Sequence, residues 1–148
     1  MQPVPLSVPD TSVLVSGATF SADPASSYLD AIKRLEAPIA LSEPILAEVE
    51  RIFGLQRIRQ FTGMSQAEAS DFVVQLREIA LIVPGTTLVS VSPDPNDNMF
   101  FACAVEAGAT HIVSDDTHHI LPIMEYHGVR PLPPGAFMAE YFPASSRL

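Results

Sequence analysis

The chain has 148 residues, of which 47% are hydrophobic and 17% are charged. This composition excludes an intrinsically disordered protein, and the length fits one domain over residues 1–148. Eight basic and 17 acidic residues give a net charge of −9, which excludes nucleic-acid binding through bulk positive charge. The lone cysteine, Cys103, excludes a disulfide framework and a cysteine-ligated zinc site.

The N-terminal region shows no signal for secretion or membrane insertion. The first positive charge is Lys33, so the basic segment that opens a signal peptide is missing. The longest uncharged stretch, residues 79–93, contains Pro84 and Gly85 and is too polar to span a bilayer. We expect a cytoplasmic protein with no membrane partner, which also suits a single free thiol.

Short apolar runs alternate with helical patterns along the chain. The strand signals are brief, and prolines separate the periodic segments. In chain order, the predicted elements are a strand over 4–8, a helix over 24–35, a strand over 39–41, a helix over 43–53, a helix over 66–80, strands over 81–83 and 88–91, a helix over 94–107, strands over 111–114 and 129–132, and a helix over 136–142.

Helix-capping residues support several of these boundaries. Ser42 is placed to cap the helix that follows it, and Ser65 with Glu68 forms a capping-box signature. Gly108 is placed to end the helix before it. Strands that alternate with helices predict an α/β domain with a mostly parallel sheet, in which ligands bind at the carboxyl ends of the strands.

Acidic residues fall at these predicted strand ends. Asp10 follows the first strand, and Asp115 and Asp116 follow the strand over 111–114. Asp94 and Asp97 begin the helix before that strand, with Asp97 on the same stripe as its apolar face. A carboxylate directed toward a core is unfavourable unless something compensates its charge.

One further acid comes from the helix over 43–53, where periodicity alone does not choose between Glu48 and Glu50. If such acids converge, their repulsion is relieved by protonation or by a divalent cation. An all-oxygen site suits Mg²⁺ or Mn²⁺, and such a cation promotes phosphodiester hydrolysis. The structural alternatives are helix caps at Asp10 and Asp94 and turn residues at 115–116.

Other polar residues also have two interpretations. Arg51, Arg57 and Arg59 form a local basic cluster, which is either a solvated face or a phosphate-contacting patch. His118 and His119 are loop residues, and His118 is a candidate contact to the metal or substrate. Cys103 is expected in the core of its helix.

Four motifs in order carry a family resemblance. They are VPDTSVLVSG (8–17), LSEPILAEV (41–49), DPNDNMF (94–100) and GATHIVSDD (108–116). In this order and spacing the chain resembles the PIN-domain family, in particular its VapC-like toxins of toxin–antitoxin systems. The resemblance implies a three-layer α/β/α fold with a central, mostly parallel sheet. It also implies an Mg²⁺- or Mn²⁺-dependent endoribonuclease, an RNA substrate, an antitoxin partner and a homodimer.

The resemblance assigns the metal and catalytic acids as Asp10, Glu48, Asp97 and Asp116, and so prefers Glu48 to Glu50. It places four residues near the substrate, namely Thr11, Ser12, Arg51 and His118.

The chain departs from the family pattern at several positions. Ser12 stands where Asn is commoner, Asp115 replaces a usual Gly, and His118 stands where a second Asp is frequent. Asn98 and Met99 replace a common acidic–Lys pair. These changes keep the four acids but bear on substrate and turnover.

Two alternatives come from other classes. A catalytically silent PIN-like module would act through protein contacts, and it would be expected to lose one or more of the acids. A flavodoxin-like phosphoryl-transfer domain would need a late lysine, whereas the only lysine is Lys33. The phosphatases of that type also need an acid where Ser12 stands.

Overall fold

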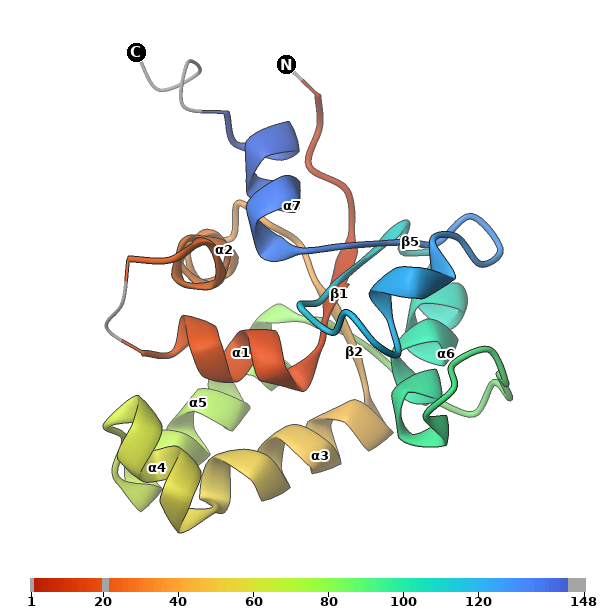
Figure 1. The fold of residues 1–148 in the computed structure, drawn as a ribbon. Coiled ribbons are helices and arrows are strands. Elements are labelled where there is room, and N and C mark those ends of the chain that lie inside the picture. Colours follow the sequence, from red (N-terminus) through yellow and green to blue (C-terminus); the bar gives the residue numbers. More distant parts are fainter. Residues whose placement is uncertain (1, 20–21, 144–148) are drawn as a thin grey trace.

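The computed structural model describes residues 2–19 and 22–143, and its centre is a parallel sheet (Figure 1). An isolated parallel bridge between Ser7 and Ile39 joins two parallel ladders, so the strands lie in the order β3–β2–β1–β4–β5. Val8 is in register with Ile112, and Ile112 with Pro131. The strands are β1 (Ser7–Pro9), β2 (Ala40–Ser42), β3 (Leu81–Val83), β4 (His111–Val113) and β5 (Arg130–Leu132).

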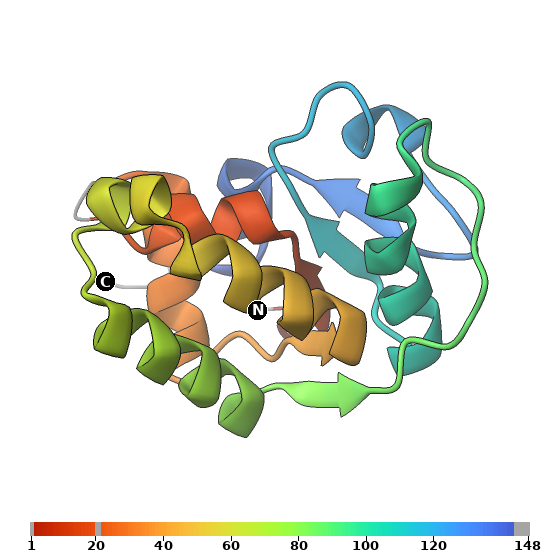
Figure 2. The ribbon, with the colours of Figure 1, turned by 90° about the horizontal axis from the view of Figure 1, so that it is seen from below.

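Helices cover both faces of the sheet. Helix α6 contacts β1 to β4 on one face, while α1, α2 and α7 lie on the other side (Figure 2). The predicted three-layer α/β/α fold is therefore confirmed. The helices are α1 (Thr11–Gly17), α2 (Pro24–Lys33), α3 (Glu43–Gly54), α4 (Gln56–Thr62), α5 (Gln66–Ile79), α6 (Asn98–Ala107) and α7 (Pro134–Tyr141), with 3₁₀ turns η1 (Pro95–Asp97) and η2 (Leu121–Ile123).

The core lies between the layers. Val8 and Ile112 from adjacent strands are fully buried, as are Phe101 of α6 and Phe137 of α7. Burying such a side chain stabilises the fold by about 1.5–3 kcal/mol. Cys103 is also fully buried on α6, which confirms the prediction that it belongs to the core.

The predicted caps are confirmed. The Ser42 side chain accepts a hydrogen bond from the backbone N–H of Ile45, and the Ser65–Glu68 capping box is complete. Gly108 ends α6 in the left-handed conformation, with φ of 71°. Glycine adopts this conformation without the steric penalty that other residues have.

The prediction of a strand over 88–91 was wrong. This segment runs outside the sheet, and the Leu88 side chain is 97% exposed. The Asn98 side-chain oxygen accepts hydrogen bonds from the backbone N–H groups of Val91 and Ser92. These donors are therefore used by a side chain instead of a strand partner.

The sequence patterns also missed α1 and misplaced β1. The segment over 11–17 is rich in β-branched residues and Ser, which have low helix propensity. Packing against α2 and the Asp10 cap nevertheless stabilise a helix there. The first strand covers Ser7–Pro9 instead of 4–8.

Within the described ranges, no helix is both long and apolar enough to cross a membrane. The longest of these helices, α5, has 14 residues.

Candidate active site

A pocket of about 760 Å³ opens beside the carboxyl ends of β1 and β4. β1 and β4 are adjacent strands, and the chain continues from β1 toward β2 but from β4 toward β5. The connections therefore run toward opposite edges of the sheet, and ligand sites in α/β folds commonly lie at such a point. All four acids assigned from the sequence line this pocket. Its lining consists of Asp10, Thr11, Ser12, Val15, Ser16, Pro44, Ala47, Glu48, Arg51, Ile52, Ile58, Asn96, Asp97, Met99, Phe100 and Asp116.

Asp10 is the most buried of the four acids, with 4% of its surface exposed. One carboxylate oxygen accepts hydrogen bonds from the Val13 backbone N–H at 2.8 Å and from the Ser12 hydroxyl at 2.9 Å. The other accepts one from the Ser114 hydroxyl. Asp10 therefore caps α1, which confirms the helix-cap interpretation of this residue. The same hydrogen bonds fix its carboxylate at the pocket wall. Burial raises the pKa of Asp10, although these three hydrogen bonds act in the opposite direction.

Ser114 connects Asp10 to Asp116. Its hydroxyl donates to Asp10 and accepts from the Asp116 backbone N–H at 3.0 Å. The Asp116 carboxylate then accepts the backbone N–H groups of His118 and His119, both at 2.9 Å. Burial opposes ionisation of Asp116, but these hydrogen bonds outweigh it and lower the pKa of Asp116.

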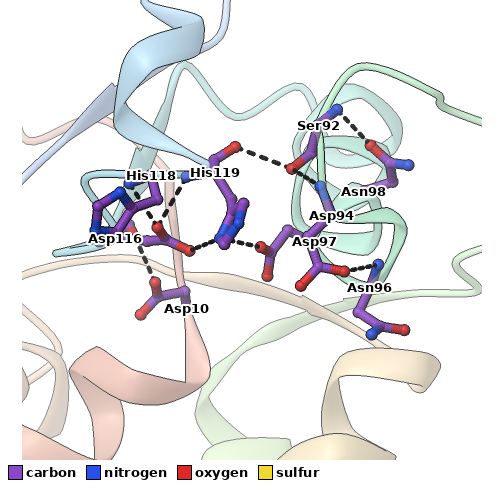
Figure 3. Close-up of polar contacts among 10 residues, drawn as sticks. Asp10, Ser92, Asp94, Asn96, Asp97, Asn98, Asp116, His118 and His119 are labelled. Carbon is purple, nitrogen blue, oxygen red and sulfur yellow. Dashed lines mark hydrogen bonds and ion pairs between the residues drawn. The ribbon is translucent and has the colours of Figure 1, made fainter.

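Asp97 lies at the junction of η1 and α6, with 19% of its side chain exposed. Partial burial, followed by the nearby charges of Asp116 and Asp94, raises the pKa of Asp97 to about 6. The His119 ring acts against this rise, because its Nδ1 atom lies 3.9 Å from the Asp97 Oδ2 atom. The same Nδ1 atom lies 3.3 Å from the Asp116 Oδ2 atom (Figure 3).

Glu48 reaches the pocket from α3 and is paired with Arg51. The guanidinium donates two hydrogen bonds to the two carboxylate oxygens, at 2.9 and 3.3 Å. Glu50 is exposed and is not among the pocket residues. Two positions along a helix differ by about 200°, so these two side chains point in nearly opposite directions.

Of the four residues expected near the substrate, three line the pocket and one does not. Thr11, Ser12 and Arg51 line the pocket. The Thr11 Oγ1 atom is buried and has no hydrogen-bond partner within residues 2–19 and 22–143. The His118 side chain is exposed and outside the pocket lining, and His118 contributes its backbone N–H to Asp116.

Sequence reasoning did not identify two residues of this region. His119, which follows Asp116 by three residues, contacts the acids with its ring, whereas the sequence favoured His118. The three-residue spacing was the available signal, because a turn can bring such residues together. The sequence patterns place Ser114 at the end of a strand, and they do not indicate its hydrogen bond to a residue 104 positions away.

The donor set fits a hard divalent cation. Four carboxylates from four separate segments line one pocket. Burial raises the pKa of Asp10, and burial together with the charges of neighbouring acids raises the pKa of Asp97. The basic side chain in the pocket lining is Arg51, which is already paired with Glu48. The excess negative charge among oxygen donors is the chemistry that Mg²⁺ and Mn²⁺ complement.

Comparisons with known proteins agree with this fold. The PIN domain family matches residues 7–118, so the chain belongs to the PIN domain family. A chain in the crystal structure of VapBC2 from Rickettsia felis, bound to a DNA fragment from their promoter, superposes with a TM-score of 0.56. That similarity has 14% sequence identity and covers 86% of this chain and 98% of the other. A comparison with curated proteins gives no match.

Proposed function

We propose that this chain is an Mg²⁺- or Mn²⁺-dependent endoribonuclease that hydrolyses RNA phosphodiester bonds. The observation that carries the proposal is the convergence of Asp10, Glu48, Asp97 and Asp116 on one pocket. Membership of the PIN domain family supports it. The four acids would hold the cation, which would acidify a water molecule for attack and stabilise charge that develops on the phosphodiester.

The side chains around the acids would keep this arrangement rigid. Ser12 and Ser114 fix the Asp10 carboxylate through their hydroxyl groups, and Ser114 also holds the Asp116 backbone. Preorganised ligands need little rearrangement when charge develops in the reaction. Ser12 is therefore proposed to position Asp10, while Thr11 has a buried hydroxyl available beside the pocket.

RNA binding by an acidic protein requires a local basic surface. Residues 51–67 contain three arginines and no acidic residue. Arg51 and Ile58 line the pocket, and Arg57 and Arg59 flank Ile58 on α4. We propose that this basic segment contacts the RNA backbone, which would position the strand without reading its sequence.

The partner proposal rests on the VapBC2 similarity. The similar solved structure is of a VapBC2 complex, and we propose that this chain is the toxin of a toxin–antitoxin pair that acts in the cytoplasm. The homodimer implied by the resemblance is part of the same proposal. Light scattering of the purified chain measures its oligomeric state. Toxicity is tested by comparing the growth of a bacterium that expresses the wild-type chain with one that expresses the Asp97→Asn variant.

Cleavage of labelled single-stranded RNA tests the nuclease directly. We expect cleavage with Mn²⁺ or Mg²⁺ and none with EDTA. Glu48→Gln and Asp97→Asn should lower the rate at least about a hundredfold, since residues that merely support metal ligands already cost about 10- to 100-fold. Glu50→Gln is the matched control for Glu48→Gln, because it makes the same change two residues away on the exposed side of α3.

The outcomes separate the two functional hypotheses. If the folded wild-type chain cuts no RNA with either metal, the nuclease proposal fails and the silent PIN-like binding module is favoured. If Glu48→Gln and Glu50→Gln cut as fast as the wild type, the activity does not come from this pocket.

A further inference from the structure

A second, smaller pocket adjoins the four-acid pocket. Its volume is about 160 Å³, and it shares the wall residues Pro44 and Met99 with the larger pocket. Drug-sized ligands occupy pockets of roughly 300–1,000 Å³, so this space suits one ring-sized group of a larger ligand. It is termed the side pocket here, and its lining includes Pro44, Leu88, Asn98 and Met99.

The side pocket lies between α6 and the loop of residues 84–94, which joins β3 to η1. Figure 2 shows this loop running along α6. The loop contributes Leu88 and Val89 to the lining, and α6 contributes Asn98 and Met99. The Leu88 side chain is 97% exposed although it is apolar. An apolar side chain beside such a pocket is suited to cover the face of a bound ring.

Side chains of α6 hold this loop in place. The Glu106 carboxylate accepts hydrogen bonds from the backbone N–H groups of Gly85 at 3.1 Å and of Thr87 at 3.0 Å. The Asn98 side-chain oxygen holds the other end of the loop through the two hydrogen bonds described above. Leu88 lies between these two anchored ends, so the wall that it forms is fixed on both sides.

The Asn98 amide presents a hydrogen-bond donor of defined orientation. Its Oδ1 atom accepts the backbone N–H groups of Val91 and Ser92, and only the amide oxygen can accept them (Figure 3). Within residues 2–19 and 22–143, these are the hydrogen bonds of the Asn98 side chain, so the two N–H groups on Nδ2 remain available. Unpaired RNA bases are bound by stacking and by hydrogen bonds to their edges, which carry acceptors.

The position of the side pocket fits a strand that crosses the four acids. Helix α3 runs along the larger pocket, with Pro44 in its first turn, Arg51 in its last turn and Glu48 between them. The proposed contacts to the RNA backbone lie at the Arg51 end, whereas the side pocket adjoins the Pro44 end. A phosphodiester held at the acids would therefore have a neighbouring nucleotide beside the side pocket.

We propose that the side pocket binds one unpaired nucleobase of the RNA, from a nucleotide next to the phosphodiester that is cut. The base lies between Leu88 and Met99, and Asn98 Nδ2 donates to an acceptor on its edge. An apolar side chain of a partner protein would leave this donor unpaired, which favours a base. The inference rests on the proposed function, and it gives a role to Asn98 and Met99, two departures from the family pattern.

Nuclear magnetic resonance of the metal-free full chain tests base binding without any cleavage. The sequence has the asparagines Asn96 and Asn98, and Asn98→Asp assigns the Asn98 amide signal by its loss while keeping an oxygen to hold the loop. The probes are the four ribonucleosides, which are neutral and are not repelled by the acids, and ribose as the control without a base. We expect at least one nucleoside to shift the Asn98 signal and ribose to leave it unchanged.

Abasic substitution tests the same pocket during cleavage. A labelled single-stranded RNA is cut with Mn²⁺, the cut is mapped, and each nucleotide is replaced in turn by an abasic one. We expect one position next to the cut at which the abasic nucleotide lowers kcat/KM at least about fivefold, the lower end of what one stacked base contributes.

A matched pair of leucine variants connects that position to the side pocket. In Leu88→Ala, the same abasic nucleotide should have less than about a twofold effect, because the wall that the base contacts is already missing. Leu35→Ala is the control, since Leu35 is also exposed, at 71%, and lines neither pocket. It should respond to the abasic nucleotide as the wild type does.

The failures are distinguishable. An abasic effect of equal size in the wild type and Leu88→Ala, or no effect next to the cut, overturns this inference while RNA cleavage remains intact. A chain whose Asn98 signal shifts with a nucleoside but which cuts no RNA supports the side pocket and refutes the nuclease. No shift with any nucleoside, or the same shift with ribose, overturns the inference and leaves a side chain of a protein partner as the alternative occupant.

Discussion

Asp97→Asn should stabilise the metal-free protein at pH 7. The Asp97 carboxyl has an ordinary pKa of 3.8, and burial with neighbouring charges raises its pKa to about 6 in the folded state. One pKa unit corresponds to about 1.36 kcal/mol, so ionised Asp97 destabilises the fold by roughly 3 kcal/mol. Its side chain is 19% exposed, which keeps solvent screening of this effect modest. Asparagine has a similar shape and removes the charge.

The sign of the pH dependence follows from the direction of this pKa. Because the folded state holds the Asp97 proton more tightly, the wild type loses stability as the pH rises from about 4 to about 6. The Asp97→Asn variant lacks this carboxyl group and therefore lacks the pH dependence of stability that it causes. The stability difference between the two proteins should therefore be small at pH 4 and approach its full value above pH 6.

Urea unfolding followed by far-UV circular dichroism measures the difference. The chain has no tryptophan, so backbone ellipticity is the suitable signal. Measurements in EDTA at pH 4 and pH 7 should give a higher midpoint for the variant at pH 7 and a much smaller difference at pH 4, with the same dependence on urea concentration. Asp71→Asn controls for charge removal, because Asp71 is exposed on α5, away from the acidic pocket. A wild type as stable as the variant at pH 7 would refute the reasoning.

Three further predictions concern stability. Ser114→Ala should destabilise the fold by about 2–4 kcal/mol in the same unfolding assay, because the buried Asp10 carboxylate loses a donor and a backbone N–H loses its acceptor; an effect below 0.5 kcal/mol would contradict it. Gly17→Ala should cost about 1–3 kcal/mol, since the added Cβ would lie 2.7 Å from the Ala25 backbone oxygen, and an unchanged midpoint would show that α1 and α2 can separate freely. Mn²⁺ at a hundred times its dissociation constant should stabilise the wild type by about 2.7 kcal/mol, and an equal gain in Asp97→Asn would place the ion elsewhere.

The local features of this fold could be predicted because short-range sequence patterns determine them. Alternating strand and helix patterns gave the α/β class, and the caps at Ser42 and Ser65 depend on neighbours three residues away. The predicted strand over 88–91 was wrong because a short-range pattern does not include Asn98, whose side chain accepts the hydrogen bonds of this segment. The patterns missed helix α1 because its residues have weak helix propensity, and packing against α2 outweighs that propensity in the folded chain.

By itself, the sequence determined the alternation of strands and helices that defines the α/β class, the positions of the acids relative to the strand ends and the excess of negative charge. Only the tertiary structure decided that the four acids line one pocket, that His119 instead of His118 turns toward them, and that Ser114 connects Asp10 to Asp116. The physical reason is distance along the chain. A hydrogen bond between residues 104 positions apart depends on how β1 and β4 pair, and no local periodicity carries that information.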